Sequence, residues 1–315
     1  CDKSVKNKYL KKIDFLIEKK IVIVQASTNY EIDNHGFITK KLFKDFSFED
    51  IFLRKTLKLK INETKKFIKN KIILITGGAG SIGGFLAKNL IQYKPKKVFI
   101  IDNNEYNNFK LKNIINHKKL NQFSFKILNI ENYSSLNSAF KEIKPNIVFN
   151  AAALKHVNFL EENPNQGLRT NYIGTKNVLS ACRKNKINFF IHVSTDKAAN
   201  PINNLGITKF LSELICHQKT TNNKTKVGIV RFGNVFDSYG SVSEIFKNNI
   251  LNSKKIKISN SEVERFFMSK DEAANFLIYA CHLLTHSKKN SKTRTFIYDM
   301  GKPIKIIDLA KKLFF

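Results

Sequence analysis

Runs of β-branched and aromatic residues alternate with amphipathic stretches of helical length through the middle of the chain. The runs that predict strands are Ile72–Thr76, Lys97–Asp102, Phe123–Ile130, Asn146–Ala151, Phe189–Thr195 and Lys226–Phe232. The stretches that predict helices are Ser81–Gln92, Ser134–Ile143, Gln166–Lys184 and Leu205–Lys219. Strands joined through helices lie parallel and bury both faces of their sheet. The pattern therefore predicts an α/β fold with a doubly wound parallel sheet and helices on both faces.

The segments on either side of this alternation have a different pattern. Residues 1–45 are too short to be a domain by themselves, and residues 46–70 are predicted to be a linker. Residues 71–234 hold the alternating units, whereas residues 235–315 predict a smaller mixed lobe that is truncated and partly interleaved with them. The chain begins without Met and stops inside an apolar-periodic stretch, which indicates a piece of a longer protein.

Composition adds a strong positive charge that is spread over the whole chain. The 315 residues include 55 Lys and Arg against 25 Asp and Glu, a formal net charge of +30. A nucleic-acid binder concentrates its basic residues on one face or arm, so we expect no specific nucleic-acid partner. The 4 cysteines lie far apart without a Cys-x-x-Cys pair, which argues against a zinc ribbon and against a dense disulfide framework, and no metal site is expected.

A glycine-rich turn joins the first predicted strand to the first predicted helix. Gly77, Gly80 and Gly83 form the pattern G-x-x-G-x-x-G, which lets the chain turn tightly and lets its backbone approach a pyrophosphate. The predicted helix begins at Ser81, and the free N–H groups of its first residues, Ser81 and Ile82, would point at the phosphates of a bound dinucleotide. A strand, this spacing and a helix together predict a dinucleotide site and hence a Rossmann-type sheet.

The second predicted strand ends in a carboxylate that selects among dinucleotides. Asp102 lies 19 residues after Gly83, where it can accept hydrogen bonds from both ribose hydroxyls of NAD and would repel the extra phosphate of NADP. NAD is therefore the predicted cofactor. Asn129, near the end of the third predicted strand, stands where many such folds have Asp beside the adenine, and its amide can still form that hydrogen bond.

The fifth predicted strand ends in a cluster of reactive residue types. Thr195, Asp196 and Lys197 follow one another at the edge where open α/β sheets place their ligands. In a continuing strand Asp196 and Lys197 would point to opposite faces, so both can reach one substrate only if the strand has ended. Lys209 lies four residues after Leu205 and therefore on the same face of the next helix.

This arrangement resembles the extended short-chain dehydrogenase/reductases, in which a Tyr-x-x-x-Lys pair follows a Ser or Thr at the end of the fifth strand. Leu205 stands at the Tyr position here. Four separated motifs narrow the resemblance, over about residues 46–315, to the polysaccharide-biosynthesis nucleotide-sugar 4,6-dehydratases, whose larger, membrane-anchored members often carry Met at that position. The motifs are Ala151–Val157, Ser194–Pro201, Val230–Val235 and Glu264–Met268. The larger members also have a first cytoplasmic domain, so the resemblance implies that residues 1–45 are the tail of that preceding domain.

The resemblance implies a reaction and a role for each residue of the cluster. Hydride passes from C4 of a UDP-N-acetyl-hexosamine, with UDP-N-acetylglucosamine favoured, to bound NAD; water then leaves from C5 and C6, and the hydride returns to C6. Lys197 would be the base at C5 and would need a neutral amine, and Asp196 would be the acid at the C6 hydroxyl. Thr195 would hydrogen-bond the C4 oxygen, and Lys209 would bind the nicotinamide ribose. The base for the C4 hydroxyl stays open because Leu205 replaces the tyrosine.

Other residues of the same motifs are candidates for binding. The resemblance assigns Ala151 and Ala152 to the cofactor. The substrate candidates are Lys155, His156, Asn234 and Arg265. Arg265 could grip a diphosphate through two parallel hydrogen bonds, and a purely structural role is the alternative for each of the four. The apolar surroundings of Cys182, Cys216 and Cys281 predict that these thiols simply pack.

Two other functions remain open at this stage. A nucleotide-sugar 4-epimerase needs the same cofactor and the same hydride from C4, but it has no use for an acid and a base at C6 and C5. A non-catalytic NAD-binding protein would fit Leu205 and the charge. The expected partners are a nucleotide sugar and further copies of the chain. No apolar run approaches the roughly 18 to 20 residues that span a bilayer, so a cytoplasmic location is expected, with a full-length form anchored at the cytoplasmic face of the inner membrane.

Overall fold

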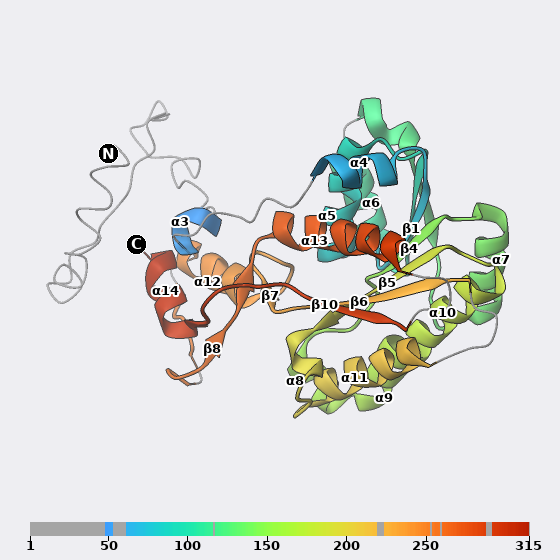
Figure 1. The fold of residues 1–315 in the computed structure, drawn as a ribbon. Coiled ribbons are helices and arrows are strands. Elements are labelled where there is room, and N and C mark those ends of the chain that lie inside the picture. Colours follow the sequence, from blue (N-terminus) through green and yellow to red (C-terminus); the bar gives the residue numbers. More distant parts are fainter. Residues whose placement is uncertain are drawn as a thin grey trace, which may run out of the picture.

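A parallel sheet of seven strands forms the centre of the protein (Figure 1). The computed structural model describes residues 48–52, 61–115, 117–218, 224–252, 254–258, 260–287 and 292–314. The predicted tail at residues 1–45 lies outside the described residues. No helix in the described ranges is both long enough and apolar enough to cross a lipid bilayer.

The strand order identifies a doubly wound sheet, so the predicted Rossmann-type α/β fold is confirmed. The order is β10-β6-β5-β4-β1-β2-β3, and every neighbouring pair is parallel. The strands are β1 (Ile72–Thr76), β2 (Lys97–Asp102), β3 (Phe123–Ile127), β4 (Ile147–Asn150), β5 (Phe189–Thr195), β6 (Lys226–Phe232) and β10 (Arg294–Ile297). The chain order reverses between β1 and β4, and ligands of such sheets bind at the carboxyl ends of the strands beside this reversal.

Helices cover both faces of the sheet, as Figure 1 shows. One face packs against α4 (Ile61–Ile68), α5 (Ser81–Leu90), α6 (Glu105–Ile114) and α13 (Lys270–Leu283). The other face packs against α7 (Tyr133–Ile143), α10 (Thr175–Lys184) and α11 (Asn204–His217). Alternate residues of each strand enter the two cores, so that Ile73 and Ile75 face the first group of helices and Leu74 faces the second. Burial on both faces explains why these strands are continuously apolar in sequence.

A smaller lobe lies beside the sheet and has a hydrophobic core of its own, to the left in Figure 1. It contains α3 (Phe48–Phe52), β7 (Asn234–Val235), α12 (Val242–Leu251), β8 (Glu264–Arg265), β9 (Phe267–Met268), β11 (Ile304–Lys305) and α14 (Ile306–Phe314). β7 pairs with β9, and β8 pairs with β11. Between these elements, α13 and β10 return to the large sheet, so the lobe and the sheet are interleaved in sequence.

Several elements differ from the sequence prediction. The predicted helix at Gln166–Lys184 is three consecutive segments, α9 (Pro164–Gly167), the π-helix η4 (Leu168–Gly174) and α10. The predicted linker at residues 46–70 contains α3 and α4, and α6, α8 (Val157–Glu162) and β10 were not predicted. The described residues also form short 3-10 turns, namely η2 (Ile91–Tyr93), η3 (His117–Gln122), η5 (Asp196–Ala198) and η6 (Leu284–His286).

Candidate active site

The turn between β1 and α5 is packed so closely that Gly77, Gly78 and Gly83 have no room for a Cβ atom. Gly77 has φ +62°, in the left-handed region, and a Cβ there would lie 2.5 Å from the Cα of Ala152 in the segment after β4. A Cβ at Gly83 would overlap the carbonyl oxygen of Gly77. The N–H of Ala151 donates to the carbonyl of Thr76 at 3.0 Å. The predicted cofactor residues Gly77, Gly83, Ala151 and Ala152 are therefore in one closely packed unit.

The start of α5 offers backbone donors at this edge of the sheet. Gly80 is the N-cap residue, and no side chain caps that end of the helix. The unpaired N–H groups of a helix N-terminus attract anions, and here they belong to the turn that includes Ser81 and Ile82. Together with the close approach that the glycines permit, this arrangement fits the pyrophosphate of a dinucleotide such as NAD.

Asp102 ties the glycine turn to the end of β2. Its side chain is buried, and its Oδ2 accepts a hydrogen bond from the N–H of Ala79 at 3.1 Å. Its Oδ1 accepts from the N–H of Asn104 at 3.0 Å. A carboxylate has about four lone-pair positions, so these two bonds leave acceptor capacity for ribose hydroxyls. Asn129, in contrast, lies exposed in the turn after β3, and its Oδ1 accepts from the N–H of Glu131 at 3.0 Å.

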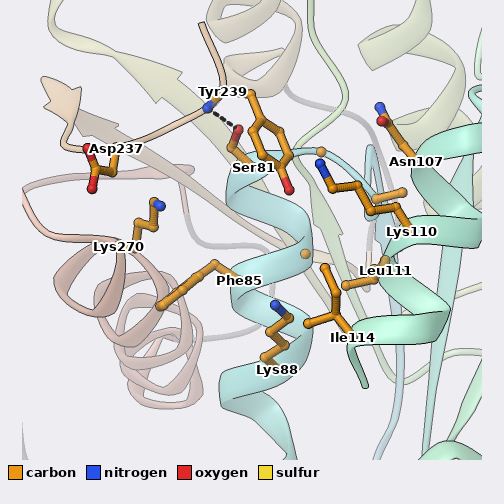
Figure 2. A pocket seen from close by; sticks show the side chains of 13 residues that line it. Ser81, Phe85, Lys88, Asn107, Lys110, Leu111, Ile114, Asp237, Tyr239 and Lys270 are labelled. Carbon is orange, nitrogen blue, oxygen red and sulfur yellow. Dashed lines mark hydrogen bonds between the residues drawn. The ribbon is translucent and has the colours of Figure 1, made fainter. Parts of the chain in front are cut away.

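A pocket of about 130 Å³ lies between the start of α5, the α6 helix, the turn at residues 237–239 and the start of α13. Figure 2 shows its lining, with the Tyr239 backbone N–H donating to the Ser81 hydroxyl at 2.8 Å. The Lys110 ammonium lies 5.2 Å from the centre of the Tyr239 ring, a cation–π contact. The segment at residues 237–239 of the smaller lobe therefore contacts the start of α5, next to the glycine turn.

The predicted reactive cluster is assembled at the end of β5. The strand ends at Thr195 and continues as the 3-10 turn η5, which confirms that the strand stops before Asp196. The Thr195 hydroxyl donates to Asp196 Oδ1 at 2.9 Å, and the Lys197 ammonium donates to the same oxygen at 3.0 Å. Lys197 Nζ also donates to Asn234 Oδ1 at 3.3 Å. Four predicted site residues therefore form one hydrogen-bonded group, in which Asp196 and Lys197 point together.

This cluster is open enough to meet a ligand. The side chain of Lys197 is 25% exposed and that of Asp196 is 30% exposed. The first turn of α11 packs against the same segment, because a Cβ at Gly206 would lie 2.7 Å from the carbonyl oxygen of Lys197. The segment is therefore held in place by its contact with α11, while the side chains of Asp196 and Lys197 stay partly exposed to solvent.

Lys209 occupies a buried position on the same helix. Its Nζ donates to the carbonyl of Val193 and lies 3.4 Å from Nε2 of His192. Burial lowers the pKa of Lys209 to about 8, against the opposite effect of the Glu213 carboxylate. Leu205, one turn earlier, is buried and supplies no proton acceptor.

The four substrate candidates lie in different surroundings. Lys155 donates to the Ser238 hydroxyl at 3.3 Å, and the ring of His156 lies against Gly240, where a Cβ would meet it. Partial burial and the charge of Lys155 lower the pKa of His156. Arg265 is exposed on β8 and donates to the carbonyl of Glu264 at 2.8 Å. Among the described residues, no hydrogen bond or ion pair joins Arg265 to the cluster that contains Asn234.

Residues that were not singled out from the sequence form polar contacts near Lys209 and the end of β5. Glu213 is buried, accepts from the Ser194 hydroxyl and forms an ion pair with Arg231. This contact joins β5, β6 and α11 one helical turn beyond Lys209. The three thiols predicted to pack are buried, and burial raises the pKa of Cys216 to about 12, so that this thiol stays protonated.

Comparison with known proteins connects this site to polysaccharide biosynthesis. Residues 73–315 match the family model described as "Polysaccharide biosynthesis protein". The chain is 32% identical, over 98% of its length, to the capsular polysaccharide biosynthesis protein CapD of Staphylococcus aureus and covers 51% of that protein. It is 35% identical to a UDP-N-acetylglucosamine 4,6-dehydratase (inverting) of Campylobacter jejuni, with coverage of 66% of this chain and 62% of the relative. It is 36% identical to a UDP-glucose 4-epimerase of Rickettsia rickettsii, with coverage of 67% and 62%.

Solved structures share the same architecture. The structure of Pen from Bacillus thuringiensis superimposes with a TM-score of 0.72 at 35% identity, over 78% of this chain and 74% of that one. The Bordetella bronchiseptica enzyme WbmF in complex with NAD⁺ superimposes with a TM-score of 0.65 at 17% identity, over 78% of each chain, a level that establishes the fold alone. The chain spans about half the length of the capsular protein, so the matches concern part of such a protein.

Proposed function

Because the chain belongs to the polysaccharide biosynthesis protein family, we propose that it catalyses the NAD-dependent 4,6-dehydration of a UDP-N-acetyl-hexosamine, with UDP-N-acetylglucosamine as the favoured substrate. The observation that carries this proposal is the hydrogen-bonded group of Thr195, Asp196, Lys197 and Asn234 at the edge of the sheet where ligands bind. A dehydration needs a proton acceptor and a proton donor near adjacent carbons, and Lys197 and Asp196 supply one of each.

The contact between Lys197 and Asp196 explains how both can reach the protonation states that the reaction needs. The amine must be neutral to take the C5 proton, and the carboxyl must be protonated to release the C6 hydroxyl as water. A single proton transfer along the 3.0 Å hydrogen bond, from Lys197 to Asp196, produces both states at once. A bound sugar excludes water from the cluster, and desolvation favours a neutral pair over an ion pair.

The other residues of the site have positioning roles in this proposal. When bound, NAD would supply a reversible store for the hydride from C4. The glycine turn and the start of α5 would bind its pyrophosphate, Asp102 its adenosine ribose, and Lys209 its nicotinamide ribose. Thr195 would donate to the C4 oxygen. Residues 71–234 would form the cofactor domain, and residues 235–315 would close the substrate side, where Lys155 and Ser238 already meet.

A nucleotide-sugar 4-epimerase is the second candidate, supported by the Rickettsia rickettsii relative. An epimerase transfers hydride at C4 only and leaves C5 and C6 untouched, so it would have no use for the pair of Asp196 and Lys197. We therefore place it behind the dehydratase.

Incubation with NAD and UDP-N-acetylglucosamine, followed by mass spectrometry of the sugar nucleotide, separates the candidates. A dehydratase gives a product lighter by one water, and an epimerase gives a product of unchanged mass with altered stereochemistry at C4. A non-catalytic NAD-binding protein gives neither product while still binding NAD, and that result would reject the proposal.

A further inference from the structure

A short segment of the smaller lobe reaches across the crevice of the large sheet. Residues 237–240, which we call the strap, form the turn that connects β7 to α12. The strap contacts Ser81, which follows β1, and also Lys155 and His156, which follow β4. The order of the strands reverses between β1 and β4, and sheets of this kind bind their ligands in the crevice at that reversal. The strap therefore has contacts on both sides of the ligand crevice.

On the β1 side, the strap is attached to the helix that follows the glycine turn. The backbone N–H of Tyr239 donates to the Ser81 hydroxyl at 2.8 Å, which is the dashed line in Figure 2. The ammonium group of Lys110, on α6, lies 5.2 Å from the centre of the Tyr239 ring. Tyr239 is nevertheless 45% exposed. This end of the strap is therefore held by one hydrogen bond and one cation–π contact rather than by burial in a core.

On the β4 side, the strap is attached to the loop that contains two of the substrate candidates. Lys155 Nζ donates to the hydroxyl of Ser238 at 3.3 Å, and Ser238 is buried. Gly240 has φ +66° and packs against the ring of His156, where a Cβ would lie 2.4 Å from Cε1. Both the left-handed conformation and the close contact favour glycine at this position. This end of the strap therefore depends on the absence of a side chain at residue 240.

The shape of the strap is fixed by its bonds to α12. Asp237 has φ +55°, a conformation that few residues other than glycine adopt. Its N–H donates to the hydroxyl of Ser243 at 2.9 Å, and its carboxylate accepts from Lys247 at 2.7 Å. Ser243 and Lys247 both belong to α12. The strap is therefore joined to the first turns of that helix and can move with them as one unit.

We propose that the strap is a gate for the dinucleotide, which closes over the crevice and has to open each time the cofactor enters or leaves. Its contacts with Ser81, Lys155 and His156 are made between groups of the protein, so they hold the strap in the free and the bound protein alike. A dinucleotide that extends along the crevice from the glycine turn lies beneath the strap. Loss of one of these contacts should therefore speed entry and release by the same factor and leave the affinity unchanged.

Such a gate has a use in the proposed reaction, in which the hydride returns to the sugar that lost it. The site must keep its cofactor until that return is complete, because early release would carry the hydride away. The inference rests on the proposed function for this benefit and for the identity of the cofactor. The movement of the strap itself is a property of the protein without any sugar.

The first test measures NADH binding by stopped flow, with the fluorescence of NADH as the signal and no sugar present. Ser81→Ala removes the acceptor of the Tyr239 N–H but keeps the backbone N–H groups of the helix. We expect the association and dissociation rate constants to rise together by about threefold to tenfold, the equivalent of one hydrogen bond, while Kd changes by less than about twofold. Ser138→Ala alters an exposed serine of α7, on the other face of the sheet, and is the matched control that should leave both rate constants unchanged.

Two results of this experiment would overturn the proposal. A rise of the dissociation rate constant alone, with Kd weakened by the same factor, would show that the Ser81 hydroxyl binds the cofactor directly. Two unchanged rate constants would show that the contact between Tyr239 and Ser81 does not limit access to the crevice.

The second test disturbs the strap from its other end. Gly240→Ala places a methyl group against the ring of His156, whereas Gly301→Ala is the matched control, because Gly301 has φ +73° but nothing within 4 Å of its added Cβ. Both variants carry the strain of a left-handed alanine, and only the first one pushes on the strap. In Gly240→Ala, the amide hydrogen of Tyr239 should exchange with heavy water faster, by about the same factor as NADH association is accelerated.

Equal behaviour of the two glycine variants, or faster NADH binding without faster exchange at Tyr239, would contradict a strap that moves as one unit. If Gly240→Ala does not fold, the rate constants of Ser81→Ala decide by themselves. Neither measurement involves turnover. Coupled rate changes in a protein that dehydrates no sugar would reject the proposed function and leave the gate standing, whereas a dehydratase whose two rate constants change independently would keep the function and reject the gate.

Discussion

The cofactor half and the reaction half of the candidate site are constructed in different ways. Around β1 and α5, the site consists of backbone held at close distance, where Gly77 and Gly83 leave no room for a methyl group. At the end of β5, it consists of side chains joined by hydrogen bonds, chiefly those of Asp196 and Lys197. The first half should therefore lose function when a residue gains volume. The second half should lose function when a side chain of unchanged size loses its ability to give or take a proton.

The largest expected effect is on the reaction half. Asp196→Asn keeps the size of the side chain but removes the acid, and loss of a general acid slows a reaction by about 10² to 10⁴-fold. We expect dehydration of UDP-N-acetylglucosamine to fall by that factor while calorimetry shows unchanged NAD binding. A variant that dehydrates at nearly the wild-type rate would remove Asp196 from the mechanism.

The matching change in the cofactor half adds one methyl group. Gly83→Ala should destabilise the protein by roughly 1–3 kcal/mol and abolish NAD binding, because its Cβ overlaps the carbonyl of Gly77. Gly84→Ala is the control, since its Cβ would meet Leu111 at 3.5 Å and the carbonyl oxygen of Gly78 at 3.6 Å, both ordinary contacts, and Ala is favoured over Gly within a helix. Thermal unfolding and NAD titration of both variants test the distinction, and equal behaviour of the two would refute it.

A pH measurement tests the burial of Lys209. Burial lowers its pKa from 10.5 to about 8 in the folded protein, so the unfolded chain binds more protons between these two values. The free energy of unfolding of the wild type, relative to that of Lys209→Met, should rise as the pH increases from 8 to 10.5, by an amount on the order of 2–3 kcal/mol. Below pH 8 Lys209 is charged in the folded protein, so the full cost of burying that charge lowers the free energy of unfolding. Denaturant unfolding across this range checks the sign, and parallel curves would contradict the burial.

The smallest expected effect concerns cofactor choice. Asp102→Ala removes a carboxylate that would bind the ribose of NAD and repel the phosphate of NADP. We expect the preference for NAD over NADP to fall by about tenfold, the equivalent of one hydrogen bond to a charged group. Competitive titration with the two dinucleotides measures it, and a preference for NADP that Asp102→Ala does not alter would show that another residue selects the cofactor.

The fold was predictable where local sequence decides it. β1, β2, β5 and β6 have the predicted limits, because strands buried on both faces are continuous apolar runs. β10 was missed because it lies at the edge of the sheet, where Arg294, Thr295 and Ile297 are exposed. The π-helix η4 was also missed. There the side chain of Asn171 bonds the backbone of Leu154 and the hydroxyl of Thr208, contacts that no helical periodicity reveals.

The candidate site was likewise predictable only where its residues are close together in sequence. The glycine turn and the segment Thr195–Lys197 are contiguous in sequence, so their residue types and spacing were informative. The buried side chain of Asn150 contacts those of Thr76 and His192, which are 74 and 42 residues away in sequence. Only the register of three neighbouring strands brings these side chains together, and register is not visible in any one strand.

Turnover in heavy water tests the central claim, which is that Lys197 and Asp196 remove water across C5 and C6. Lys197 exchanges its protons with solvent, whereas the hydride from C4 returns within the same molecule. The product from UDP-N-acetylglucosamine should therefore lack one water, carry deuterium at C5 and retain the original C4 hydrogen at C6. Lys197→Ala should form no product. A dehydrated product without deuterium at C5, or undiminished dehydration by Lys197→Ala, would show that another group is the base.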